Sequence, residues 1–280
     1  MTRRCRPTSR RRCRAGPRRR RGRRRADPAA SVAIEDHGAV RLIRIEREAR
    51  SNALDAAASI AIDRAVDEAE RDPAIHVLLL TAAGDRAFCA GMDLKEAAER
   101  GAGHGLIPGR GFAGLTERRR TKPLVVAVNG AAVAGGFEIV LAADIVVAAD
   151  HALFGLAEVK RGMFAFAGGV QRLARAVPRA TALNLILTGE PIAAERAFAL
   201  GLVSEVVPAE RLAARAMEVA REIAGFDRDT VRRALALHDF AADAPIHESL
   251  DFGRRYGEET LGSAAERAAV RAYAEGRARP

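Results

Sequence analysis

The sequence predicts an α/β fold with mostly parallel strands, on three observations. Continuous apolar runs of strand length recur along the chain, as at Val77-Leu78-Leu79-Leu80, and such runs are typical of strands buried on both faces. Helical patterns lie between the runs, and this alternation favours a parallel sheet covered by helices. The chain has 280 residues, of which 49% are hydrophobic, and this is enough for a sizeable core.

Periodicity and turn residues place the elements of the first half. Two short strands surround the turn Asp36-His37-Gly38, and Pro73 ends the first helical pattern. The expected strands span residues 32–34, 39–46, 76–81, 124–128 and 145–148. The expected helices span residues 53–72, 94–100, 112–120 and 137–143.

The pattern changes after Val207. Apolar residues recur at helical spacing from Leu212 to Ile223, with Gly225 as the expected C-cap. Further helices are expected near residues 230–238, 246–260 and 264–276. We therefore expect three regions, which are a disordered Arg-rich tail at 1–27, an α/β core at 28–207 and a helical region at 208–280. A helical region of this kind often docks on a neighbouring copy.

The positive charge of the chain belongs to its N-terminal tail. Residues 1–25 hold 14 Arg and no acidic residue, and removing those 14 from the 46 basic residues leaves 32 against 36 acidic groups. The tail has almost no apolar residues to bury, which favours disorder. It also lacks the apolar face of a transit peptide and the apolar segment of a secretory signal. We interpret it as unconnected with the chemistry and expect no nucleic-acid binding.

The sequence lacks several kinds of functional signal. No apolar run reaches 18 residues, so we expect no membrane span. Cys89 is the only cysteine outside the tail, which fits an inert core thiol in a reducing, cytoplasmic compartment. The six His are scattered without metal-ligand spacing, and serine-hydrolase and P-loop motifs are missing. Residues 109–114 match a dinucleotide-binding motif but follow no strand, so we expect a loop there.

Two glycine-containing turns each join a buried strand to a helix. One is Ala87-Phe88-Cys89-Ala90-Gly91-Met92-Asp93-Leu94, and the other runs from Asn129 through Gly135 to Glu138. Small residues let a backbone approach a ligand closely, and free N–H groups at a helix start carry partial positive charge. Two such turns could supply two donors to one carbonyl oxygen. Ordinary strand-to-helix turns would give the same pattern.

Glu138 and Glu158 are the acidic residues of interest. Each lies in a mostly apolar stretch, and apolar surroundings raise a carboxyl pKa towards the range used in acid–base catalysis. They are 20 residues apart on different elements, so only the fold can bring them together. Either one alone is more often an exposed or capping acid.

Several segments, taken in their order along the chain, resemble the enoyl-CoA hydratase/isomerase, or crotonase, superfamily. The resemblance covers roughly residues 39–208. Each motif is weak alone, but their order and spacing are specific. The motifs are Arg47-Glu48-Ala49-Arg50-Ser51-Asn52-Ala53-Leu54, the two glycine turns, Phe154-Gly155-Leu156-Ala157-Glu158-Val159, Gly168-Gly169-Val170-Gln171-Arg172-Leu173, Leu187-Thr188-Gly189-Glu190-Pro191-Ile192 and Gly201-Leu202-Val203.

The resemblance implies a crotonase-like spiral of ββα units with a helical C-terminal trimerisation region, assembled as a homotrimer or a dimer of trimers. By position, the N–H groups of Met92 and Gly135 would form an oxyanion hole for the carbonyl of an acyl-CoA thioester. Coenzyme A is part of this substrate, and no metal or other cofactor is implied. The CoA site would be lined by Ala90, Gly91, Asp93, Leu94 and Lys95.

The resemblance also implies a reaction. Glu138 and Glu158 match the two glutamates that family hydratases use on water and substrate, whereas isomerases typically lack an acid at the position of Glu138. We therefore expect addition of water across the 2,3 double bond of a 2-enoyl-CoA to give 3-hydroxyacyl-CoA. The alternatives are enoyl-CoA isomerisation, another crotonase-type reaction, and a non-catalytic acyl-CoA-binding or nucleic-acid-binding role.

Two regions depart from the family's pattern. Ala165 and Phe166 stand where many relatives carry Pro and a small residue, so we expect Phe166 to shorten or reshape the acyl pocket. Near the C-terminus, Tyr273 is followed by Gly276 and Arg277 instead of a Lys-Arg pair. This difference is expected to weaken a contact to a neighbour's CoA.

Overall fold

The computed structural model of the chain describes residues 31–101 and 103–275, so the predicted Arg-rich tail lies outside the described residues. A six-stranded sheet has the order β1-β2-β3-β7-β9-β12. β1 and β2 pair antiparallel, and every later pair in this sheet is parallel, which confirms the predicted α/β fold. The strands are β1 (Val32–His37), β2 (Val40–Ile45), β3 (Val77–Ala82), β7 (Leu124–Val128), β9 (Ile145–Ala149) and β12 (Glu205–Val207).

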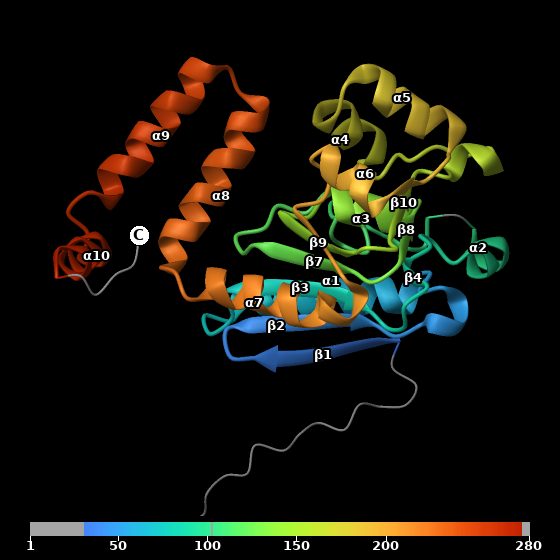
Figure 1. The fold of residues 1–280 in the computed structure, drawn as a ribbon, viewed down its shortest axis with the longest axis horizontal. Coiled ribbons are helices and arrows are strands. Elements are labelled where there is room, and N and C mark those ends of the chain that lie inside the picture. The colour runs from blue at the N-terminus through green and yellow to red at the C-terminus, as the bar shows by residue number, and fades with distance from the viewer. Residues whose placement is uncertain (1–30, 102, 276–280) are drawn as a thin grey trace, which may run out of the picture.

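The central strands are apolar along their whole length because helices cover both faces of this sheet. Alternate residues of a strand point to opposite faces. Leu78 and Leu80 of β3 belong to the apolar cluster that includes α1 (Ala56–Arg71), whereas Leu79 belongs to the cluster that includes α7 (Leu212–Ala224). Figure 1 shows α7 lying along the sheet.

A smaller sheet carries both glycine turns. Its order is β11-β10-β8-β4, and β4 and β8 are parallel, so their carboxyl ends lie at one edge of the sheet. At that edge β4 (Ala87–Cys89) leads towards α2 (Leu94–Arg100), and β8 (Ala131–Val133) leads into α3 (Gly135–Leu141). The other two strands are β10 (Leu153–Gly155) and β11 (Ile192–Ala193).

The helix predicted over residues 112–120 is wrong. A short hairpin of β5 (Leu106–Ile107) and β6 (Gly111–Phe112) precedes a series of turns there. Ala113 has a φ of 54° and Gly114 a φ of 67°, and these left-handed conformations stop a right-handed helix. The apolar spacing of this stretch reflects burial of separate loop residues.

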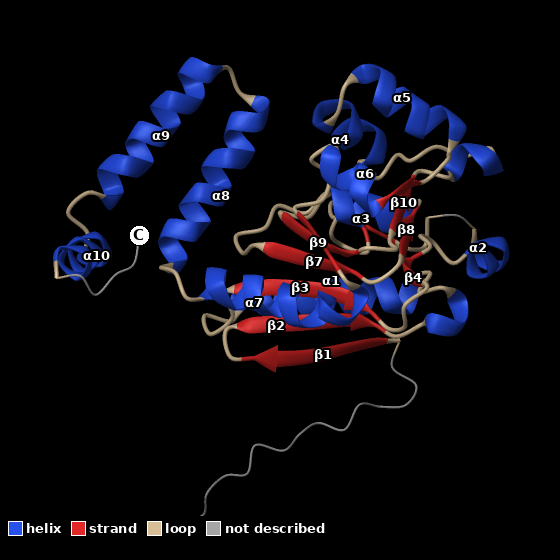
Figure 2. Cartoon of the chain, viewed as in Figure 1, coloured by secondary structure: helices blue, strands red, loops and turns tan. Residues whose placement is uncertain are grey.

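The remaining helices divide into two groups, as Figure 2 shows. α4 (Gly169–Ala176), α5 (Arg179–Thr188) and α6 (Ala194–Ala199) lie beside the smaller sheet, and α8 (Arg228–Asp243), α9 (Ile246–Thr260) and α10 (Ala264–Ala274) project as an arm. Short 3₁₀ turns occur at Glu48–Arg50, Glu158–Arg161 and Ala209–Arg211. Across the described residues, no helix has the length and apolar character needed to cross a membrane. The division of the core from the C-terminal region at residue 207 stays a prediction.

Candidate active site

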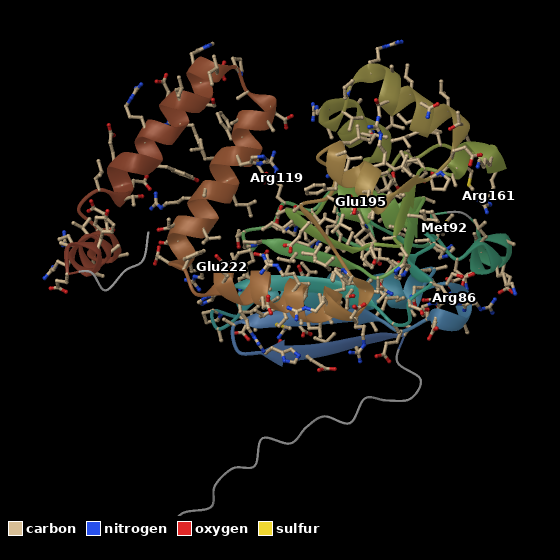
Figure 3. All side chains as sticks on the ribbon, viewed as in Figure 1. Arg86, Met92, Arg119, Arg161, Glu195 and Glu222 are labelled. Atoms are coloured by element: carbon tan, nitrogen blue, oxygen red, sulfur yellow. The ribbon has the colours of Figure 1, made fainter. Side chains whose placement is uncertain are left out.

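The two glycine turns meet at a pocket of about 380 Å³. Met92 and Arg161 both line it, and Figure 3 shows them on the side of the molecule that carries α2. Gly91 is the exception among the predicted site residues, because it is buried behind the pocket wall and does not line the pocket. The predicted residues that line it are Ala90, Met92, Asp93, Leu94, Lys95, Gly135, Glu138, Glu158 and Phe166.

The first candidate donor is the Met92 N–H. Leu54 forms a parallel bridge with Met92, in which the Leu54 N–H donates to the Gly91 carbonyl at 2.8 Å and the Asp93 N–H donates to the Leu54 carbonyl at 2.9 Å. These two bonds flank Met92, so its own N–H points away from Leu54. No hydrogen bond within the described part of the chain uses this N–H.

The second candidate donor is the Gly135 N–H at the start of α3. Ala134 adopts φ 52° and ψ −129°, a strained conformation for a residue with a side chain, and this turn orients the first N–H of the helix. That N–H has no partner among the described residues, as expected at a helix start. A Cβ at Gly91 would lie only 3.0 Å from the Gly135 nitrogen, so the two turns touch. The two free donors therefore lie close together.

Glu138 lies one helical turn after Gly135 and is 4% exposed. Its Oε1 accepts a hydrogen bond of 3.0 Å from the Gly169 N–H, at the start of α4. Burial raises the pKa of Glu138, whereas the N–H groups of Gly169 and Ala167 and the charge of Arg172 oppose that rise. Glu138 therefore lies in an apolar site but has partners for its ionised form.

Glu158 has a different environment, although it faces the same pocket and is only 9% exposed. Burial raises the pKa of Glu158 to about 7, and the negative charge of Glu138 adds to the rise, whereas a hydrogen bond from its own backbone N–H and the charge of Arg161 oppose it. Its Oε2 is buried and accepts no hydrogen bond among the described residues. A carboxyl with a pKa near neutrality can both hold and release a proton at the pH of catalysis.

Both carboxyls have raised pKa values, but their hydrogen-bond partners differ. Glu138 has N–H donors that favour the carboxylate, whereas the buried Glu158 oxygen lacks a donor. Paired acids in different environments are typical of acid–base catalysis. The arrangement can hold a base, an acid and two donors for a developing negative charge around one small ligand.

Aromatic side chains form part of the pocket wall. Phe164 and Phe166 are 64% and 54% exposed, and their ring centroids are 5.8 Å apart. Phe112 is buried, and a Cβ at Gly135 would lie 2.7 Å from its ring. Sequence reasoning missed Phe112 because it belongs to the misassigned helix, and it missed Phe164 although this residue is adjacent to the pair Ala165-Phe166 that it did single out.

Neither a nucleophilic cysteine nor a metal centre is found among residues 31–101 and 103–275. Cys89 is fully buried behind the first turn, and burial raises the pKa of its thiol to about 12, so it packs as an inert thiol. No group of three or more His, Cys, Asp or Glu side chains in these residues is arranged to hold a metal ion.

Comparisons with known proteins identify the family. A family model described as "Enoyl-CoA hydratase/isomerase" matches residues 35–280. A carnitinyl-CoA dehydratase of Salmonella arizonae is 41% identical over 194 residues, which are 69% of this chain and 74% of the relative.

Solved structures give the same assignment of the fold. An enoyl-CoA hydratase from Mycobacterium tuberculosis H37Rv superposes with a TM-score of 0.83 at 36% identity, covering 88% of this chain and 96% of that one. A carnitinyl-CoA hydratase from Mycobacterium avium superposes with a TM-score of 0.71 at 39% identity and the same coverage. The chain therefore belongs to the enoyl-CoA hydratase/isomerase, or crotonase, family of acyl-CoA enzymes.

Proposed function

We propose that the protein adds water across the 2,3 double bond of a 2-enoyl-CoA thioester to give a 3-hydroxyacyl-CoA. The observation that carries this proposal is the pair of buried glutamates, Glu138 and Glu158, in one pocket with the free N–H groups of Met92 and Gly135. An isomerase needs one group to move a proton, whereas addition of water needs groups that act on both water and substrate.

The proposed mechanism uses each group once. The thioester oxygen accepts hydrogen bonds from the Met92 and Gly135 N–H groups, which stabilise the negative charge that develops there when C3 is attacked. Glu138, as carboxylate, takes a proton from the attacking water. Glu158, as carboxylic acid, gives its proton to C2. The water oxygen is then bonded to C3, and the proton on Glu138 restores the starting state by transfer to Glu158.

A second candidate is dehydration of carnitinyl-CoA, which the names of the relatives favour. The carnitinyl group has a hydroxyl at C3 and a trimethylammonium group at C4, so its dehydration is the same chemistry in reverse. Phe164 and Phe166 offer aromatic faces of the kind that attract quaternary ammonium groups. Arg161 lines the same pocket, and its positive charge disfavours such a group.

The test follows the loss of enoyl-thioester absorbance with the full-length protein. Substrates are crotonyl-CoA, longer 2-enoyl-CoAs, the 4-trimethylammonio-2-butenoyl thioester and, for the alternative of isomerisation, 3-enoyl-CoAs. Loss of absorbance with formation of 3-hydroxyacyl-CoA supports hydration, and the preferred acyl group separates the two candidates. If only 3-enoyl-CoAs react, and they give 2-enoyl-CoAs without added water, the chain is an isomerase.

We also propose that the C-terminal arm assembles the protein into a homotrimer or a dimer of trimers. The arm exposes large apolar side chains that a monomer leaves in water. Light scattering after gel filtration tests this proposal, and a monomeric mass would contradict it. The exposed side chains are Ile246, Leu250, Leu261, Val270 and Tyr273.

A further inference from the structure

Arg47 makes contacts that connect the start of α1 with the start of α2. Its Nε donates to the Ala53 carbonyl at 2.7 Å, one terminal nitrogen contacts the Asp55 carboxylate, and the other donates to Asp93 Oδ2 at 2.7 Å. The Arg47 side chain is only 16% exposed; it does not line the substrate pocket but lines the adjoining polar cavity together with Asp55 and Asp93. All three guanidinium nitrogens are therefore used inside the protein.

The two carboxylates that bind Arg47 also cap the N-termini of α1 and α2. Asp55 caps α1 by accepting the Ala58 N–H at 2.7 Å, and Asp93 caps α2 by accepting the Lys95 N–H at 3.1 Å. The side chains of Asp55 and Asp93 are 21% and 11% exposed. Charge-assisted bonds of this shielded kind are stronger than surface ion pairs.

These contacts flank the bridge that sets the direction of the Met92 N–H. Ala53 and Asp55 lie on either side of Leu54 in sequence, and Asp93 follows Met92 directly. Arg47 therefore contacts both backbone segments of the β-bridge, the one that contains Leu54 and the one that contains Met92. Among the described residues, no side chain of the pocket makes a hydrogen bond to Met92. The position of its backbone therefore depends on the bridge and on Arg47.

We propose that Arg47 is a positioning residue, which holds the Met92 N–H in the direction required to hydrogen-bond the thioester oxygen. The inference rests on the proposed function of the pocket. An oxyanion donor acts more strongly on the transition state than on the bound substrate, so a misdirected Met92 N–H should lower kcat more than it changes KM. A lysine at residue 47 cannot reach three acceptors in one plane.

The test compares Arg47→Gln and Arg47→Lys with the wild type. Arg44→Gln is the matched control, because Arg44 lies on β2 and pairs with Glu46 and Glu35 at the surface. Turnover gives kcat and KM. The carbonyl stretching frequency of a bound conjugated thioester reports hydrogen bonding to its oxygen, and is recorded in a Glu158→Gln background that does not consume it.

We expect Arg47→Gln to lower kcat about 10- to 100-fold, short of complete loss of a donor at about 10²–10³-fold, with KM changed less than about threefold. The bound carbonyl frequency should move towards its value in water. Arg47→Lys should recover part of both effects, and Arg44→Gln should leave both unchanged. If Arg47→Gln does not fold, Asp55→Asn provides the comparison, because it keeps a cap acceptor, removes a charge that Arg47 binds and lies outside the pocket lining.

An unchanged carbonyl frequency, or a change in KM alone, would overturn the proposal. A wild-type protein that binds enoyl-CoA but adds no water would instead refute the proposed function. The frequency measurement would still test Arg47 in that case, because the donor acts on any bound thioester carbonyl.

Discussion

Replacing Glu158 with Gln tests whether this carboxyl gives a proton to the substrate. Gln has nearly the same size but no acidic proton to transfer. Loss of a general acid costs about 10²–10⁴-fold in rate, so we expect kcat to fall by that amount. Binding of the acyl-CoA should remain, because the donors at Met92 and Gly135 are untouched.

The same substitution should stabilise the protein at alkaline pH. Burial raises the pKa of Glu158 from 4.5 to about 7. Between these values the unfolded chain loses its proton while the folded protein keeps it, so the free energy of unfolding falls as the pH rises from about 4.5 to about 7. At roughly 1.4 kcal/mol for each pH unit, the full effect is about 3 kcal/mol. Residual contact with water reduces our expectation to about 2 kcal/mol.

Urea unfolding at pH 5 and pH 8.5 measures this effect. The free energy of unfolding of Glu158→Gln should exceed that of the wild type by about 2 kcal/mol at pH 8.5 and by less than about 1 kcal/mol at pH 5. Glu222→Gln is the control, since Glu222 is an exposed residue of α7 (Figure 3) and should show no such difference. Equal stability changes at both pH values would refute the argument from burial, and undiminished kcat would refute the role of Glu158 as acid.

Three further substitutions probe the pocket. Gly135→Ala should abolish most turnover and cost about 1–3 kcal/mol of stability, because the new Cβ would lie 2.7 Å from the Phe112 ring; kinetics and urea unfolding measure both. Ala134→Gly should stabilise by about 1 kcal/mol, since Gly tolerates φ 52° without the cost of a side chain, and no gain would argue against strain. Phe166→Ala should shift the preference towards longer 2-enoyl-CoAs, and an unchanged chain-length profile would show that this ring does not limit the pocket.

Buried strands and capped helices could be predicted from local sequence. The strand at Leu124–Val128 and the helix at Leu94–Arg100 have the predicted bounds. The polar Asn129 directly follows the apolar run of the strand, and Asp93 caps the start of the helix. The helix expected to begin at residue 53 begins at Ala56 instead, because Leu54 bonds to Gly91 and Asp93 far along the chain and Asp55 caps the helix.

The site depended on contacts that sequence spacing does not contain. Glu138 and Glu158 were singled out by their apolar surroundings, but only the family resemblance implied that they share a pocket. The contacts of Arg47 with Asp93 and of Phe112 with Gly135 join residues 46 and 23 positions apart. Periodicity reports which face of an element is buried, and it does not report which distant side chain lies against it.

The most direct test of the proposed hydration is the fate of solvent oxygen. The full-length protein is incubated with crotonyl-CoA in water labelled with ¹⁸O, and the product is analysed by mass spectrometry. We expect 3-hydroxyacyl-CoA with one ¹⁸O at C3, formed by the wild type and about 10²–10⁴-fold more slowly by Glu158→Gln. A converted thioester without ¹⁸O, or labelling at the same rate in both proteins, would contradict it.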